Sequence, residues 1–166
     1  MNRDPTLCRE FVKQAKGILS QHPQIRHNWS VDADEDHCIL DIPVQCEGGF
    51  DITAEVADEE ITVSAGGAHS NANLAGGDPE EFVGRALGMV RDLLSPAMRV
   101  RERTAGGRAY KWAFEFFQDG KWRMTEEVCL LFWNWFGRRG ERLHQNTVLP
   151  SRDNPVESEP LDAPKG

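Results

Sequence analysis

A chain of 166 residues with 39% hydrophobic and 28% charged side chains has the composition of a globular protein with one core. Its apolar runs are all shorter than the roughly 20 residues that cross a bilayer, which argues against an integral membrane protein. The formal net charge of −8 argues against general nucleic-acid binding, because phosphate contacts need a positive surface. Acid and proline at Asp4 and Pro5 stand where a secretory signal would be apolar, so we expect a cytoplasmic protein.

Catalytic and metal-binding patterns do not stand out. The 4 cysteines are spread along the chain without a C-x-x-C pair, and the 5 histidines fall in different predicted elements. Reduced thiols in the core explain the cysteine spacing. We therefore expect neither a cofactor nor a metal site, and a non-enzymatic protein is favoured over an enzyme.

The first half of the chain predicts a helix followed by an antiparallel meander. Residues 6–20 show the three-four apolar spacing of an amphipathic helix. Residues 65–77 are small and rich in glycine, and we expect them to form a long loop. Alternation of apolar and polar residues between these two segments predicts strands at 25–31, 38–44, 50–56 and 61–63.

A second helix has the clearest local signal. Asp78 is a favourable N-cap, Pro79 suits the first helical position, and Glu81 completes a capping box. Apolar spacing then continues from Phe82 to Leu94. Further strand patterns follow this helix at residues 98–103, 108–118, 121–136 and 141–146.

This order of elements predicts one α+β domain over residues 1–148. We expect a single antiparallel sheet of about six to eight strands in helix-meander-helix-meander order, with the helices packed on one face. Residues 149–166 lack periodicity and are expected to be a flexible, acidic, proline-containing tail. In element order, over about residues 5–135, the chain resembles the small acidic secretion chaperones, which implies a chaperone-like or adaptor protein.

Asp119-Gly120 is the signal of a two-residue β-hairpin and fixes a register for the strands on either side. In that register Trp112 faces Glu127, and Arg123 lies on the same face. Desolvation by aromatic rings would raise the pKa of Glu127, so a pocket around Glu127 and Arg123 for a small polar ligand is one hypothesis. A β-bulge in the hairpin would instead turn Glu127 to solvent and Glu126 inward.

Basic side chains form a row at Arg99, Arg101 and Arg103 on one face of a predicted strand. With Trp133 and Trp135 such a surface could stack nucleic-acid bases. A solvated strand face, or a charged edge that deters aggregation, is the simpler interpretation of the row. We therefore do not expect a nucleic-acid partner.

Most aromatic residues lie between Tyr110 and Phe136, and residues 128–136 are apolar on both faces. This pattern fits either a central buried strand or an interface with a second copy or another protein. The sequence therefore predicts a non-enzymatic protein-interaction module, with a ligand-binding or enzymatic domain as the alternative. The candidate binding residues are Trp112, Arg123, Glu127, Trp133, Trp135, Arg99, Arg101 and Arg103.

Overall fold

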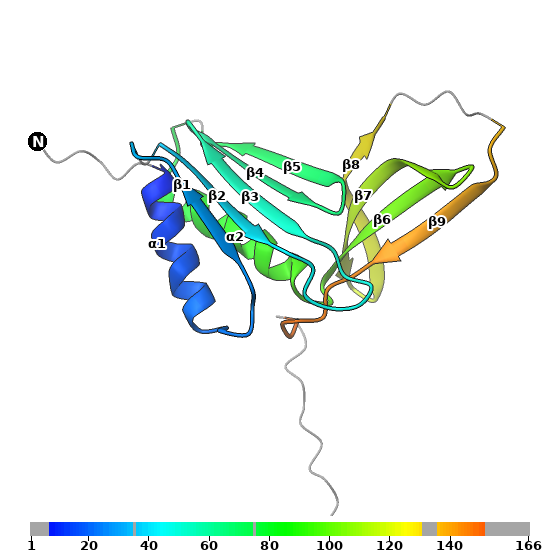
Figure 1. The fold of residues 1–166 in the computed structure, drawn as a ribbon, viewed down its shortest axis with the longest axis horizontal. Helices are drawn as coiled ribbons and strands as arrows, with labels where there is room; N and C mark the ends of the chain where they lie inside the picture. Colours follow the sequence, from blue (N-terminus) through cyan, green and yellow to red (C-terminus); the bar gives the residue numbers. More distant parts are fainter. Residues whose placement is uncertain (1–6, 35, 75, 131–135, 152–166) are drawn as a thin grey trace, which may run out of the picture.

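The strands of this chain form two sheets rather than one. The structure is a computed structural model and describes residues 7–34, 36–74, 76–130 and 136–151. The α+β class and the antiparallel pairing are confirmed, but the expectation of a single sheet is wrong: the strand orders are β1-β2-β3-β4-β5 and β8-β7-β6-β9 (Figure 1). The elements are α1 (Leu7–Ser20), β1 (Asn28–Val31), β2 (His37–Ile42), β3 (Ile52–Ala57), β4 (Glu60–Ala65), β5 (Ala68–Asn73), α2 (Pro79–Leu93), β6 (Met98–Ala105), β7 (Arg108–Gln118), β8 (Lys121–Cys129) and β9 (Arg139–His144).

The first sheet, β1 to β5, has both helices on one of its faces, as expected (Figure 1). Alternate residues of β2, β3 and β4 are buried, which is the pattern of a sheet with one covered face. The apolar stripe of α1 packs against them, with Phe11 at 0% exposure. Among the described residues no helix is long and apolar enough to cross a membrane.

The predicted start of the second helix is confirmed. The Asp78 side chain accepts a hydrogen bond from the backbone N–H of Glu80 at 3.1 Å, and Pro79 is the first helical residue. This N-cap satisfies one of the backbone donors that the first helical turn leaves without a partner. Leu93, near the other end of α2, is fully buried beneath the first sheet.

The prediction of a loop over residues 65–77 is wrong, because this segment contains β5. Gly66 and Gly67 form the turn of a β4–β5 hairpin with φ angles of 54° and 95°, which glycine adopts without strain. A side chain at Gly67 would also place its Cβ 2.6 Å from Nε1 of Trp112. The turn therefore packs against β7 and joins the first sheet to the second.

The second sheet combines the predicted hairpin with a strand from further along the chain. Asp119 and Gly120 have φ angles of 51° and 73°, and Phe117 pairs with Trp122 as expected. The last strand, β9, pairs with β6 instead of β8, so the expected meander order fails here. Figure 1 shows the second sheet beside the first, with β8 next to β5.

After β9 the chain returns to the first sheet through a buried asparagine. Asn146 has 0% exposure, and its Nδ2 donates hydrogen bonds to the carbonyls of Phe50 at 3.2 Å and Leu93 at 3.1 Å. Its Oδ1 accepts from the backbone N–H of Phe50 at 3.3 Å. Leu149, where the predicted tail begins, is only 3% exposed, so core packing continues to this residue.

Candidate functional site

A β-bulge in the β7–β8 hairpin decides which side chains share a face. Glu115 pairs with Met124 as the turn dictates, but Phe114 pairs with Glu126, so Thr125 is an additional residue in β8. An additional residue reverses the alternation beyond it. Every residue of β8 after Thr125 therefore faces the side opposite to the one that an unbroken register gives.

The predicted grouping of Trp112, Arg123 and Glu127 is separated by this bulge. Arg123 pairs with Phe116 and so shares a face with Trp112, whereas Glu127 pairs with Ala113 on the opposite face. The expectation that Glu127 faces Trp112 is thus wrong. The orientation of Glu127, away from Trp112, agrees with the alternative prediction for a hairpin that contains a β-bulge.

Each of the two charged residues has a nearby counter-charge instead. The Glu127 carboxylate lies 2.6 Å from Nζ of Lys111, and the Arg123 guanidinium lies 3.7 Å from the Asp119 carboxylate. Both members of the Arg123–Asp119 pair are more than half exposed. Screening by water makes such a pair weak.

The side of the second sheet that faces away from the first is called the outer face below. Strand alternation and register place one side chain in two from each of its strands on this side. It includes Arg99, Arg101, Arg103, Lys111, Ala113, Glu115, Phe117, Trp122, Met124, Glu127, Glu141 and Leu143.

Glu115 is the buried charge of the outer face, at 6% exposure. Its two carboxylate oxygens each lie 2.6 Å from a guanidinium Nε, one of Arg99 and one of Arg101, and Arg101 also lies 2.6 Å from Glu141. Burial by itself raises the pKa of Glu115, but the hydrogen bonds from Arg101 and Arg99 outweigh burial, so the pKa is lowered. The same contacts, first of all the one with Glu115, raise the pKa of Arg101.

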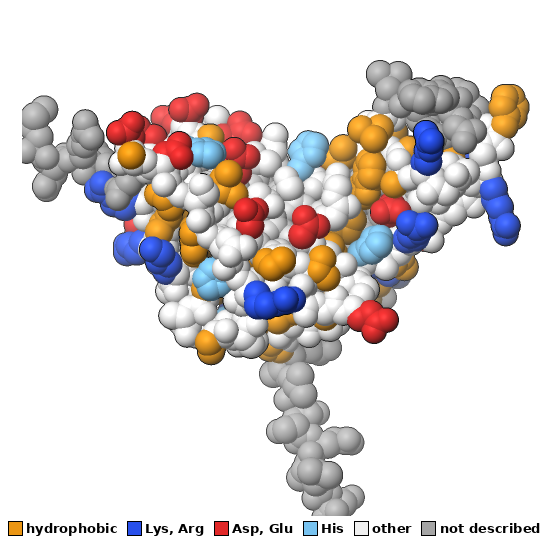
Figure 2. Space-filling view, viewed as in Figure 1, with side chains coloured by type: hydrophobic (Ala, Val, Ile, Leu, Met, Phe, Trp, Pro, Cys, Tyr) orange, Lys and Arg blue, Asp and Glu red, His pale blue; other side chains and the backbone are white. Residues whose placement is uncertain are grey.

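The basic row therefore lies on one strand face, as the sequence predicts, but it is largely neutralised there. Arg103 is exposed and pairs in register with Lys111 and Glu141. Because β6 lies between β7 and β9, the interpretation of the row as a charged edge is wrong. Figure 2 shows acidic side chains gathered at one end of the first sheet, whereas Lys and Arg side chains lie over α1 as well as over the second sheet.

Apolar side chains on the outer face remain open to solvent. Phe117 is 47% exposed, Met124 59% and Leu143 49%. The ring of Trp122 lies 5.2 Å from that of Phe117 and 4.0 Å from the Arg99 guanidinium, a cation–π distance. Trp133 and Trp135 lie outside the described residues.

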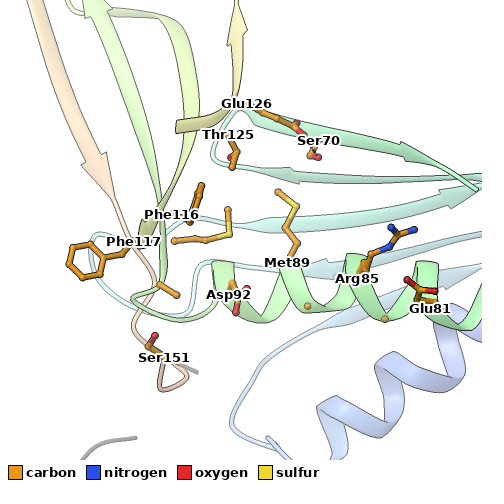
Figure 3. Close-up of a pocket in the computed structure, with 14 residues that line it drawn as sticks. Ser70, Glu81, Arg85, Met89, Asp92, Phe116, Phe117, Thr125, Glu126 and Ser151 are labelled. Carbon is orange, nitrogen blue, oxygen red and sulfur yellow. Dashed lines mark hydrogen bonds between the residues drawn. The ribbon is translucent and has the colours of Figure 1, made fainter. Parts of the chain in front are cut away.

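On the opposite side of the second sheet, an open cleft of about 910 Å³ lies between α2, β5 and the β7–β8 hairpin (Figure 3). Its volume is within the range of small-molecule and peptide sites. Met89, Met98 and Phe116 supply apolar surface, and Met89 points from α2 toward the wall formed by β5 and β8. In that wall the Ser70 hydroxyl donates to the Glu126 carboxylate at 2.7 Å.

Sequence reasoning missed this cleft, because its walls come from segments far apart in the chain. The consequence of a bulge for Glu126 was predicted, but nothing indicated that β5 would lie opposite. Gly84 and Gly88, one turn apart within α2, were the sequence signal that could have indicated the cleft. Glycine weakens a helix, so two glycines on one side of a helix indicate that space is needed on that side.

The described residues do not suggest metal or thiol chemistry. No group of three or more His, Cys, Asp or Glu side chains in the described ranges could hold a metal ion. Cys8 and Cys38 are buried, and burial raises the pKa of the Cys38 thiol, which disfavours the reactive thiolate. Neither cysteine nor histidine lines the cleft.

Comparison with known proteins adds no relative to this picture. No model of a protein family matches the chain, and neither a curated protein nor a solved structure is similar to it.

Proposed function

We propose that this chain is a non-enzymatic protein-interaction module that uses the outer face to bind a second copy of itself. The observation that carries the proposal is the exposure of Phe117 and Met124 beside Trp122, together with that of Leu143 on β9, at the other edge of the same face. Exposed aromatic and methionine side chains are enriched at protein interfaces, and tryptophan is a frequent anchor. The exposed apolar residues of the outer face are therefore its most distinctive surface feature.

Charge pairing on the outer face supports its burial in an interface. Glu115 is already paired with two arginines, and Glu127 with Lys111. Burying a charge is costly when it has no partner, and these charges bring their partners with them. A copy of the chain can therefore cover Glu115 and Glu127 without separating them from their basic partners.

A second copy also suits the distribution of charge over the chain. With a net charge of −8, two copies repel each other over most of their surfaces. The outer face differs, because three of its basic side chains, those of Arg99, Arg101 and Lys111, are paired with acidic ones. A two-fold contact between identical outer faces therefore brings together surfaces with a far smaller excess of charge than the chain as a whole.

Sedimentation over a range of protein concentrations tests this function. The wild-type chain should form dimers, and Met124→Glu should shift the population to monomers, because it places a new charge in the interface. Val44→Glu is the matched control, since Val44 is also exposed, at 47%, but lies outside the outer face. Circular dichroism should show that both variants are folded. A wild-type chain that remains monomeric, or two variants that dimerise equally, contradicts the proposal.

A ligand-binding domain is the second candidate, and the cleft specifically favours it. The grouping that first suggested a ligand, Glu127 with Arg123, is divided between the two faces of the sheet. Glu126 takes the place of Glu127 in this hypothesis, because it lines the cleft.

A further inference from the structure

The cleft is elongated along α2. Its lining follows the helix from Glu81 to Asp92, which at ~1.5 Å per residue is a distance of about 16 Å. An extended polypeptide advances about 3.3 Å per residue, so about five residues span the cleft. Length and openness thus fit a segment of chain that enters from one end and leaves from the other.

The apolar surface of the cleft is adaptable. Met98 is buried and Phe116 half-buried, and both belong to strands of the second sheet, while Met89 reaches toward them from α2 (Figure 3). Methionine side chains are unbranched and can repack around different partners. Apolar side chains of several shapes therefore fit against this surface.

The glycine at position 84 is not required by packing within the chain. A Cβ added there would meet only Oε1 of Gln14, at an ordinary contact distance of 3.8 Å. Alanine or leucine would favour the helix more strongly than glycine does. Gly84 is also one of the residues that line the cleft, so the lack of a side chain there leaves the α2 backbone accessible to another chain.

Acidic groups outnumber basic ones around the cleft. Glu81 and Asp92 stand on α2 and Glu126 on β8, against the single guanidinium of Arg85. The Glu126 carboxylate accepts a hydrogen bond from the Ser70 hydroxyl, which orients it. A partner with a positive charge beside its apolar groups complements this arrangement.

We infer that the cleft between α2 and β8 binds an extended polypeptide segment in which a lysine or arginine lies beside apolar side chains. The apolar side chains pack against Met89, Met98 and Phe116, and the cation lies near Glu126. Both β5 and β8 are edge strands of their sheets, so each leaves one side of its backbone outside the sheet ladders. Of the residues that line the cleft, only Phe117 also belongs to the outer face, and binding in the cleft does not depend on dimer formation.

Fluorescence anisotropy with two labelled pentapeptides tests the inference. The first carries one lysine flanked by leucine and phenylalanine, and the second has glutamate in place of the lysine. We expect the lysine peptide to bind the full chain about tenfold more tightly, because one charge contact of this kind is sufficient for that ratio. Lack of binding at about 1 mM lysine peptide, or equal binding of both peptides, overturns the inference.

Two substitutions in helices locate the site. Gly84→Leu fills the cleft and should weaken binding of the lysine peptide about tenfold, whereas Gly17→Leu should leave it unchanged. Gly17 is the matched control, since it is a helical glycine on α1 with open space around it. Both changes raise helix propensity, so neither should prevent folding. Equal binding by the two variants contradicts the location.

Two neighbouring glutamates separate the cleft from general electrostatic attraction. Glu126→Lys and Glu127→Lys change the net charge equally, but the bulge places Glu126 in the cleft and Glu127 on the outer face. Only Glu126→Lys should reverse the preference between the two peptides. The same reversal in Glu127→Lys would show that overall charge, not the cleft, selects the peptide. Binding by Met124→Glu at wild-type strength would show that the cleft works without the dimer.

Discussion

The two sheets differ in how their faces are covered. In β3, at the centre of the first sheet, every second residue is buried under the helices. In β8, at the edge of the second sheet, no residue is buried. The helices cover the first sheet, whereas paired charges and exposed apolar side chains make up the outer face of the second.

This difference indicates where the free energy of folding comes from. Burial of apolar side chains between α1, α2 and the first sheet supplies the largest share. The second sheet adds Phe114 and Val100 to the same core through its inner side. Its outer face contributes less to folding, and for that reason it can hold exposed apolar residues.

The largest expected difference in stability is between two Phe→Ala substitutions, one in the core beneath the first sheet and one on the outer face of the second. Phe11→Ala removes a ring with 0% exposure and should lower the free energy of unfolding by about 3–5 kcal/mol. Phe117→Ala removes a ring with 47% exposure and should lower it by about 1 kcal/mol or less. Urea unfolding at a fixed protein concentration measures both values. Equal losses would contradict the contrast between the two regions.

A smaller loss of stability is expected from a substitution at Asn146, where the chain returns from the second sheet to the first. Asn146→Ala leaves the carbonyls of Phe50 and Leu93 without their side-chain donor, which should cost about 2–4 kcal/mol. Thr147→Ala, at the exposed neighbouring residue, is the control and should change stability by less than about 0.5 kcal/mol. Urea unfolding again measures the change. A small effect at Asn146 would show that the second sheet docks without this link.

The charge cluster of the outer face, Glu115 with Arg99 and Arg101, should stabilise the fold to an extent that depends on pH. Glu115→Gln weakens the hydrogen bonds to Arg99 and Arg101 and should cost about 1–3 kcal/mol at neutral pH. The pKa of Glu115 is lower in the folded chain than its ordinary value of 4.5, so the folded state binds fewer protons in acid. The stabilisation is complete above the unfolded pKa and is lost as pH falls through the folded one.

Comparison of the free energy of unfolding at neutral and at acidic pH tests whether the contribution of Glu115 is lost in acid. The wild-type chain should lose more stability in acid than Glu115→Gln does, because the variant has no carboxylate to protonate there. Glu127→Gln is the control, since the Glu127 side chain is 31% exposed and its pair with Lys111 is worth less than about 1 kcal/mol. The same acid dependence in the wild-type chain and in Glu115→Gln would contradict the role of the cluster.

Much of the fold could be predicted from local pattern alone. The helices follow from apolar spacing and from the Asp78 cap, and the β7–β8 turn follows from Asp119-Gly120. These signals act over a few residues, where backbone preference decides the conformation. Strand β5 was missed because its sequence is Ala-His-Ser-Asn-Ala-Asn, which has neither β-branched residues nor apolar alternation.

The division into two sheets and the sites could not be predicted in the same way. Alternation indicates a strand but not its neighbour, and the pairing of β9 with β6 joins segments separated by the whole hairpin. The bulge at Thr125 leaves no mark in composition, yet it decides whether Glu126 or Glu127 enters the cleft. The cleft depends on β5, so the missed strand also hid the site.

The smallest effect concerns the uncovered face of the first sheet, which is the counterpart of the outer face. His37 lies 2.9 Å from the Glu55 carboxylate and 3.5 Å from that of Asp32, and all three side chains are more exposed than Glu115. Its pKa is raised above 6.5, first by the hydrogen bond with Glu55, against a smaller opposing effect of desolvation, with further raising by Asp32. Protonated His37 therefore stabilises the fold below the unfolded pKa, and this contribution disappears as pH rises through the folded one.

Proton NMR titration of the His37 ring measures this small contribution directly. Glu55→Gln should lower the pKa of His37 more than Asp32→Asn does, because the Glu55 contact is shorter and is the hydrogen bond with the largest effect. Solvent screening should keep the accompanying change in stability well below that of Glu115→Gln. If Glu55→Gln and Asp32→Asn lower the pKa of His37 equally, the nearby negative charges together, and not the hydrogen bond with Glu55, raise that pKa. The charged groups around His37 would then lack the specific hydrogen bonding that Glu115 has on the outer face, in addition to being more exposed than Glu115.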